Sequence, residues 1–144
     1  MRSPASLFLP GLVLAALAAG AGPATAGDIR SDTRIEGGTW LAEDIQSRGA
    51  MDYLQTTLQV TSGGGVSGFG GCNRYFGDAE IDGDKIRFGA LGATRMACPA
   101  AVMDQESRFL AALELVRRWR VEPTGLLHLL DEDGVTVVRF SRQS

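Results

Sequence analysis

Histidine and cysteine, the usual ligands of zinc, are scarce in this sequence. His128 is its single histidine, and Cys72 and Cys98 are its two cysteines. A structural zinc site needs about four nitrogen or sulfur ligands, so zinc is not expected. The two cysteines are also too far apart for a CxxC redox motif. The sequence therefore predicts no metal and no cofactor.

An excess of basic residues is absent as well. The chain has 14 Lys and Arg against 17 Asp and Glu, which gives a formal net charge of −3. Nucleic-acid binding needs a concentrated basic face to contact phosphates, and no stretch of the chain supplies one. Nucleic acid is therefore not an expected partner.

Long apolar runs are missing outside the N-terminal region. There, Arg2 precedes the apolar run Leu7–Ala19, and Ala24-Thr25-Ala26 is the small-x-small pattern that signal peptidase recognises. These features predict a signal peptide over residues 1–26, cleaved after Ala26, and an exported mature chain with no transmembrane segment. The alternative is an uncleaved membrane anchor. No cysteine follows the apolar run, so the lipid-attachment site of a bacterial lipoprotein is missing.

The mature chain of about 118 residues has the size of one domain with a single core. Removing residues 1–26 takes away one basic residue and no acidic one, which leaves 13 basic and 17 acidic residues and a net charge of −4. Both cysteines lie in this exported part, and an even number in an oxidising compartment favours a disulfide between Cys72 and Cys98. Free thiols and a metal site are the alternatives.

Short strands and tight turns dominate the mature chain. Residues 27–37 are polar and aperiodic, which predicts a flexible lead-in. Alternating apolar residues predict strands, and Asp82-Gly83 is a strong hairpin turn. The predicted strands are Thr39–Gln46, Tyr53–Val60, Val66–Gly71, the two arms of the hairpin Asp78–Phe88, Arg120–Glu122, Leu126–Leu130 and Val135–Ser141.

One amphipathic helix is predicted over about Ala100–Arg118. Its apolar residues recur at three- and four-residue steps and form one stripe: Val102, Met103, Phe109, Leu110, Leu113 and Val116. Glu106 falls within this stripe, and a buried carboxylate needs a partner, for which Arg74 or Arg95 is expected. The elements together indicate the α+β class, with an antiparallel sheet rolled into a partly open barrel and interrupted by this helix.

The pattern resembles the META domain family, also described as HslJ-like. The resemblance rests on Thr39-Trp40-Leu41, on VSGFGGCNRYFG from Val66 to Gly77, on LGATRMAC from Leu91 to Cys98, on Glu106, Phe109, Leu110 and Leu113, and on the final hairpin Leu127–Phe140. It places a single META domain over residues 38–142. It implies a barrel-like sheet with one helix, a bacterial envelope setting that is the periplasm for an exported chain, links to heat response and antibiotic tolerance, and no defined catalytic activity.

Polar residues gather at both ends of the segment between the cysteines. They are Asn73, Arg74 and Tyr75 at one end, Thr94 and Arg95 at the other, and Glu106 on the following helix. A disulfide would bring them together. They form either a small recognition patch or a structural cluster, and the second is favoured because buried polar groups usually serve the fold.

Two functional hypotheses follow, and neither is an enzyme. The first is an envelope stress-response or interaction module that binds an unidentified protein of the cell envelope. The second is a carrier of a small hydrophobic ligand or lipid in the cavity of a half-open barrel. A Cys72 or Cys98 nucleophile with His128 as base is the enzymatic alternative, which an oxidising compartment disfavours. A monomer is expected.

Overall fold

The computed structural model describes residues 11, 20, 22 and 33–144. Apart from residues 11, 20 and 22, the predicted signal peptide (residues 1–26) lies outside the described residues. Residues 27–32 of the predicted lead-in lie outside them as well. The described part contains ten strands and one helix: β1 Thr39–Ile45, β2 Arg48–Gly49, β3 Thr57–Val60, β4 Gly65–Phe69, β5 Arg74–Asp82, β6 Lys85–Phe88, β7 Gly92–Ala93, α1 Ala100–Leu115, β8 Arg118–Val121, β9 Leu127–Leu130 and β10 Thr136–Arg142.

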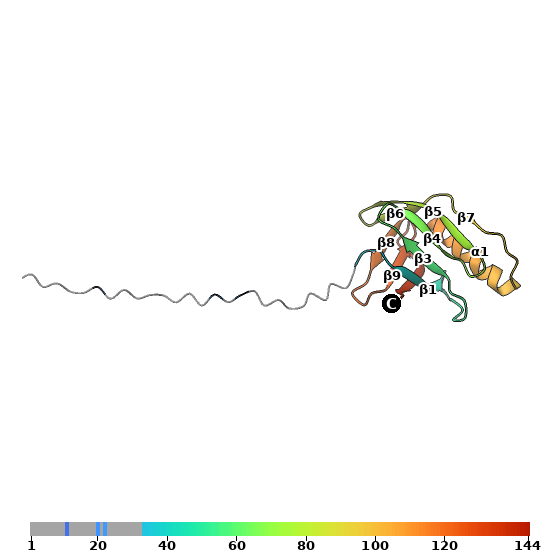
Figure 1. Ribbon diagram of the computed structural model, residues 1–144, viewed down its shortest axis with the longest axis horizontal. Coiled ribbons are helices and arrows are strands. Elements are labelled where there is room, and N and C mark those ends of the chain that lie inside the picture. The colour runs from blue at the N-terminus through green and yellow to red at the C-terminus, as the bar shows by residue number, and fades with distance from the viewer. Residues whose placement is uncertain (1–10, 12–19, 21, 23–32) are drawn as a thin grey trace, which may run out of the picture.

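Eight strands form a closed antiparallel barrel in the order β1, β3, β4, β5, β6, β8, β9, β10 (Figure 1). The pairing of β10 with β1 completes the ring. The two short strands lie outside it: β2 pairs with β1, and β7 pairs with β5. The predicted α+β barrel with one helix is confirmed, and the ring is closed. Its thinnest seam lies between β6 and β8, which share one residue pair, Lys85 with Arg118.

Aromatic side chains from the sheet and the helix fill the barrel. Trp40, Tyr75, Phe109 and Phe140 are each at most 1% exposed. The ring of Phe109, on α1, meets the rings of Tyr75 and Phe140 edge to face, with centroids 5.5 and 6.2 Å apart. Such contacts add to the hydrophobic gain from burying large rings. The helix is therefore part of the core, and its buried face points into the barrel.

The helix is shorter than its sequence pattern predicts. It ends at Leu115, because Val116 adopts an extended conformation with ψ of 133°. The N–H of Arg117 then donates to the carbonyl of Leu130, and Arg118 opens β8. Pairing with β9 thus removes the last predicted helical residues. The prediction of a helix reaching Arg118 was wrong by one turn.

Two further boundaries differ from the predictions. Within the predicted flexible lead-in, Ile35 is 1% exposed in the core, and its carbonyl accepts the indole N–H of Trp40 at 2.8 Å. The fold therefore begins before residue 38. The predicted strand Tyr53–Val60 starts later, at Thr57, and Tyr53 is exposed. None of the described residues forms a helix long and apolar enough to cross a membrane.

Candidate functional site

A disulfide joins the loop between β4 and β5 to the start of the helix. Cys72 and Cys98 are bonded, with their Cα atoms 6.0 Å apart. Cys72 lies in the loop before β5, and Cys98 lies two residues before α1. The predicted pairing is confirmed. It brings the two ends of the segment between the cysteines together beside the buried face of α1.

The Glu106 carboxylate is the centre of a buried polar cluster next to this disulfide. Its Oε2 accepts the backbone N–H groups of Cys72 at 2.9 Å and Asn73 at 2.6 Å, and its Oε1 accepts the Asn73 side-chain amide at 2.8 Å. The residue is 5% exposed. Three donors replace the water that burial removes, which is the condition for a stable buried carboxylate.

Asn73 links this carboxylate to the irregular segment between β7 and α1. Its Oδ1 accepts the N–H of Met96 at 2.6 Å and the hydroxyl of Thr94 at 3.0 Å. Its Nδ2 donates to Glu106 and, at 3.3 Å, to the carbonyl of Met96. Every polar atom of this amide is therefore used, and Asn73 connects three segments of the chain.

The loop itself is shaped by glycine. A Cβ on Gly70 would lie 2.8 Å from Oε2 and from Cγ of Glu106, so a larger residue would displace the carboxylate. Gly71 has φ of 129°, a conformation that side-chain-bearing residues rarely adopt. The dense glycines of this stretch thus allow the loop to approach the helix closely.

Gln105 forms a second arm of the cluster, which the sequence analysis missed. It is fully buried; its Nε2 donates to the Thr56 hydroxyl at 3.0 Å, and its Oε1 accepts the N–H of Met51 at 2.9 Å. Thr56 in turn donates to the carbonyl of Gly70 at 3.0 Å. The sequence spacing could have identified Gln105 as a buried residue, because it lies three residues after Val102 and four before Phe109 on the apolar stripe of the helix.

Tyr75 lies beneath the same loop. Its hydroxyl donates to the carbonyl of Thr57 at 2.6 Å, and its ring packs on Phe109. Burial raises the pKa of this hydroxyl above its ordinary value, so Tyr75 stays protonated. The side chain ties β5 to β3 at the point where the loop leaves the barrel.

The two arginines of the predicted cluster do not join it. Among the described residues, neither Arg74 nor Arg95 forms an ion pair with Glu106, and both side chains are exposed. The expected counter-charge was therefore wrong. The carboxylate is already occupied by backbone and amide donors, so a guanidinium gains nothing by giving up its hydration to reach it.

His128 lies on the outer face of β9, in a different environment. Its Nδ1 lies 3.0 Å from the Thr136 hydroxyl, and its Nε2 lies 2.7 Å from Oε1 of Glu122. Burial, with the nearby positive charge of Arg120, lowers the pKa of the imidazole against the opposing effect of Glu122. Both thiols are in the disulfide, and no group of three or more His, Cys, Asp or Glu in the described chain could hold a metal ion.

Outside the loop, three aromatic residues mark a face of the barrel, which we call the aromatic face: Tyr53, Phe69 and Phe76. Phe69 lines two adjoining surface hollows of about 410 and 530 Å³, with Phe76 in the first and Tyr53 in the second. Tyr53 is 75% exposed and Phe76 58%. Arg74 is the one charged residue among those that line either hollow; the others are threonine, serine, glutamine, glycine, leucine and aromatic residues.

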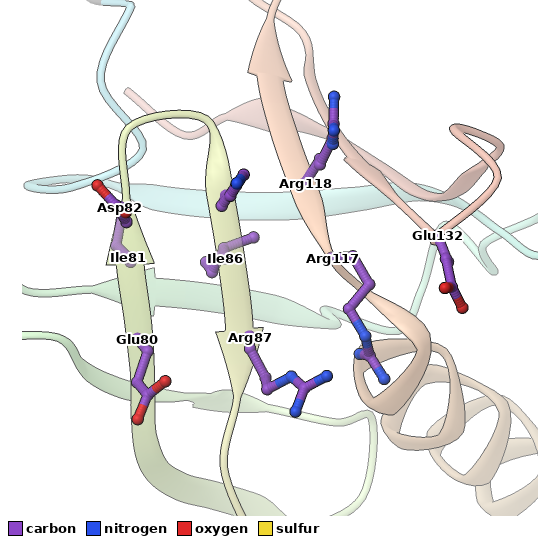
Figure 2. Close-up of a pocket in the computed structure, with 9 residues that line it drawn as sticks. Glu80, Ile81, Asp82, Ile86, Arg87, Arg117, Arg118 and Glu132 are labelled. Atoms are coloured by element: carbon purple, nitrogen blue, oxygen red, sulfur yellow. The ribbon is translucent and has the colours of Figure 1, made fainter.

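A third hollow has the opposite character. It has a volume of about 590 Å³ and lies between the β5–β6 hairpin and the start of β8 (Figure 2). Seven of its nine lining residues are charged: Glu80, Asp82, Lys85, Arg87, Arg117, Arg118 and Glu132. We call it the seam hollow, because β6 and β8 meet there.

The fold and the cluster define a class of protein: a small closed β-barrel with one core helix, in which a disulfide and a buried glutamate hold the β4–β5 loop. The sequence model of the META domain matches residues 33–144. The chain therefore belongs to the META domain family, and the resemblance seen in the sequence is confirmed.

Solved structures share this fold. A protein from Burkholderia xenovorans, determined by NMR, is 29% identical with a TM-score of 0.61 over 76% of this chain and 84% of its own. A second NMR structure has a TM-score of 0.56 at 15% identity, over 74% of this chain and 90% of its own, which shows the fold alone. No curated protein matches the chain.

Proposed function

We propose that this protein is a non-enzymatic interaction module of the bacterial envelope, which binds a protein partner through the aromatic face. The observation that carries the proposal is the composition of the two hollows at Phe69. Aromatic residues and arginine are enriched at protein interfaces, and other charged residues are depleted at their centres. One arginine and three aromatic side chains on an otherwise uncharged surface match that composition.

The buried cluster gives this face its shape. Phe69 ends β4 and Arg74 begins β5, and the loop between them is the one that Glu106 and the disulfide hold. A rigid loop loses less conformational entropy on binding than a mobile one. In this proposal the role of the buried cluster is structural: it presents the surface and takes no part in a reaction.

The proposal that the protein is exported is supported by the N-terminal sequence and the disulfide, and not by the aromatic face. The N-terminal pattern of residues 1–26 is that of a cleaved signal peptide, and a disulfide suits an oxidising compartment such as the periplasm. A role in stress response is suggested by the family resemblance alone. The ligand-carrier hypothesis is less favoured, since Trp40, Tyr75, Phe109 and Phe140 occupy the interior that a hydrophobic ligand would need.

The test is in-cell crosslinking followed by affinity purification of the full chain. We expect a partner that the wild type captures and that the variants F69S and F76S lose, while thermal unfolding shows that both variants remain folded. V135S is the matched control, because Val135 is an apolar residue, 57% exposed, in the turn before β10. Equal capture by all four proteins would exclude the aromatic face as the binding surface.

A further inference from the structure

The seam hollow is lined by two arginines that come from different elements. Arg87 projects from β6 and Arg117 from the junction of α1 and β8, and Figure 2 shows both reaching into the space between these elements. Both also line a neighbouring hollow of about 430 Å³ on the helix side. The two side chains therefore stand together where the barrel is closed by a single residue pair.

Arg117 is held in place by the end of the helix. Its Nη1 donates to the carbonyls of Glu114 at 2.9 Å and Val116 at 2.7 Å. These carbonyls are among those that a helix C-terminus leaves without partners in the helix. The guanidinium is thus oriented by the backbone, and its remaining N–H groups are available to a ligand.

Arg87 has no counter-charge within the described residues. It pairs across the hairpin with Glu80, yet no oxygen of Glu80 lies within ion-pair distance of its guanidinium. Arg118, in contrast, lies 4.0 Å from Asp84 and points away from Arg117 in Figure 2. Lys85, two residues before Arg87 on the exposed face of β6, adds a third positive charge and forms no ion pair with any residue that the structure describes.

We propose that Arg87 and Arg117 form a binding site for a compact phosphoryl group, with Lys85 as a supporting charge. Two neighbouring guanidinium groups repel each other, and an anion placed between them relieves that repulsion. Their planar donor pattern suits the oxygens of a phosphoryl group. The acidic rim formed by Glu80, Asp82 and Glu132 disfavours an extended polyanion, so the ligand is a small phosphate or a single phosphorylated headgroup.

This site lies at the far end of β5 from the aromatic face, so it is independent of the proposed protein partner. Isothermal titration of the full chain with pyrophosphate, at ionic strength matched with sodium chloride, tests it. We expect the R87Q variant to bind at least about tenfold more weakly, the loss typical of one charge-assisted hydrogen bond. R48Q, which changes an exposed arginine on β2, is the matched control and should bind like the wild type.

Cosedimentation with phosphatidic acid vesicles separates the two sources of the group. Vesicle binding that pyrophosphate competes away assigns the site to a lipid headgroup, and pyrophosphate binding without vesicle binding assigns it to a soluble phosphate compound. R117Q serves as a second variant, with circular dichroism to check the helix end. No binding by the wild type, or equal binding by R87Q and R48Q, overturns the proposal.

Discussion

The pairing of Glu106 with Asn73 allows a sharp test of the buried cluster. In E106Q, one amide oxygen can still accept the two backbone N–H groups of Cys72 and Asn73, but the new NH₂ group faces the NH₂ group of Asn73. Asn73 cannot turn its oxygen toward it without losing its bonds from Thr94 and Met96. We expect a loss of about 2 to 4 kcal/mol in the free energy of unfolding, because hydrogen bonds to a charged acceptor become neutral and one is lost.

The reciprocal variant, N73D, is destabilised because two acceptors face each other, whereas in E106Q two donors do. N73D places a carboxylate against the Glu106 carboxylate in a buried site, and a buried charge without its partner costs about 3 to 5 kcal/mol. The double variant N73D/E106Q restores one donor facing one acceptor. It keeps the acceptors for Thr94 and Met96 and loses the bond of Nδ2 to the carbonyl of Met96.

We therefore predict that the double variant is more stable than the sum of the single losses allows, by about 2 kcal/mol, a coupling usual for residues in one network. Urea unfolding followed by tryptophan fluorescence, with the disulfide intact, measures all four proteins. Purely additive losses would refute the hydrogen-bond pattern assigned to this pair.

Three further predictions concern stability. Folding lowers the pKa of His128 from its ordinary value of 6.5, so the contribution of the neutral imidazole to the free energy of unfolding is complete above pH 6.5 and is lost as the pH falls below that value. Urea unfolding midpoints measured between about pH 5 and 8 should therefore fall toward low pH in the wild type, and should depend less on pH in H128Q. Replacing Cys72 and Cys98 by serine should lower the unfolding free energy by about 3 to 4 kcal/mol for a sequence separation of 26, and a loss below about 1 kcal/mol would contradict the loop-closure estimate. Gly70→Ala should cost about 1 to 3 kcal/mol by displacing the buried carboxylate, whereas Gly63→Ala, with no atom within 4 Å of the added Cβ, should change the melting temperature little.

The sequence predicted the strands of the barrel because the signals for them are local. Alternating residues and the Asp82-Gly83 turn define strands and a hairpin without any knowledge of distant segments. The end of the helix was missed for the opposite reason. Arg117 and Arg118 continue the helical pattern in sequence, and their pairing with Leu130 in the sheet overrides it.

The sequence predicted many of the residues in the buried cluster but not the contacts that they make. Sequence shows the charge of Glu106 and of nearby arginines, so an ion pair is the natural expectation. The actual donors include the backbone N–H groups of Cys72 and Asn73, which become available only when glycine lets the loop turn toward the helix. Residue types do not show which backbone N–H groups a carboxylate will contact. The predicted partner of Glu106 was wrong for this reason.

The aromatic face was not predicted at all. Tyr53, Phe69 and Phe76 come from separate segments and adjoin only after β3, β4 and β5 pair. The sequence analysis assigned none of the three side chains to an exposed face. Their exposure is a property of the assembled sheet, in which Leu58, Val66 and Tyr75 take the inward positions.

Native mass spectrometry of the protein, purified without detergent from the periplasm, the compartment proposed for it, tests most directly whether the protein works from its outer surface. We predict a folded chain with its disulfide and no hydrophobic ligand, because Trp40, Tyr75, Phe109 and Phe140 fill the barrel. A stoichiometric adduct that extracts into organic solvent as lipid would contradict this prediction and establish the carrier hypothesis in its place.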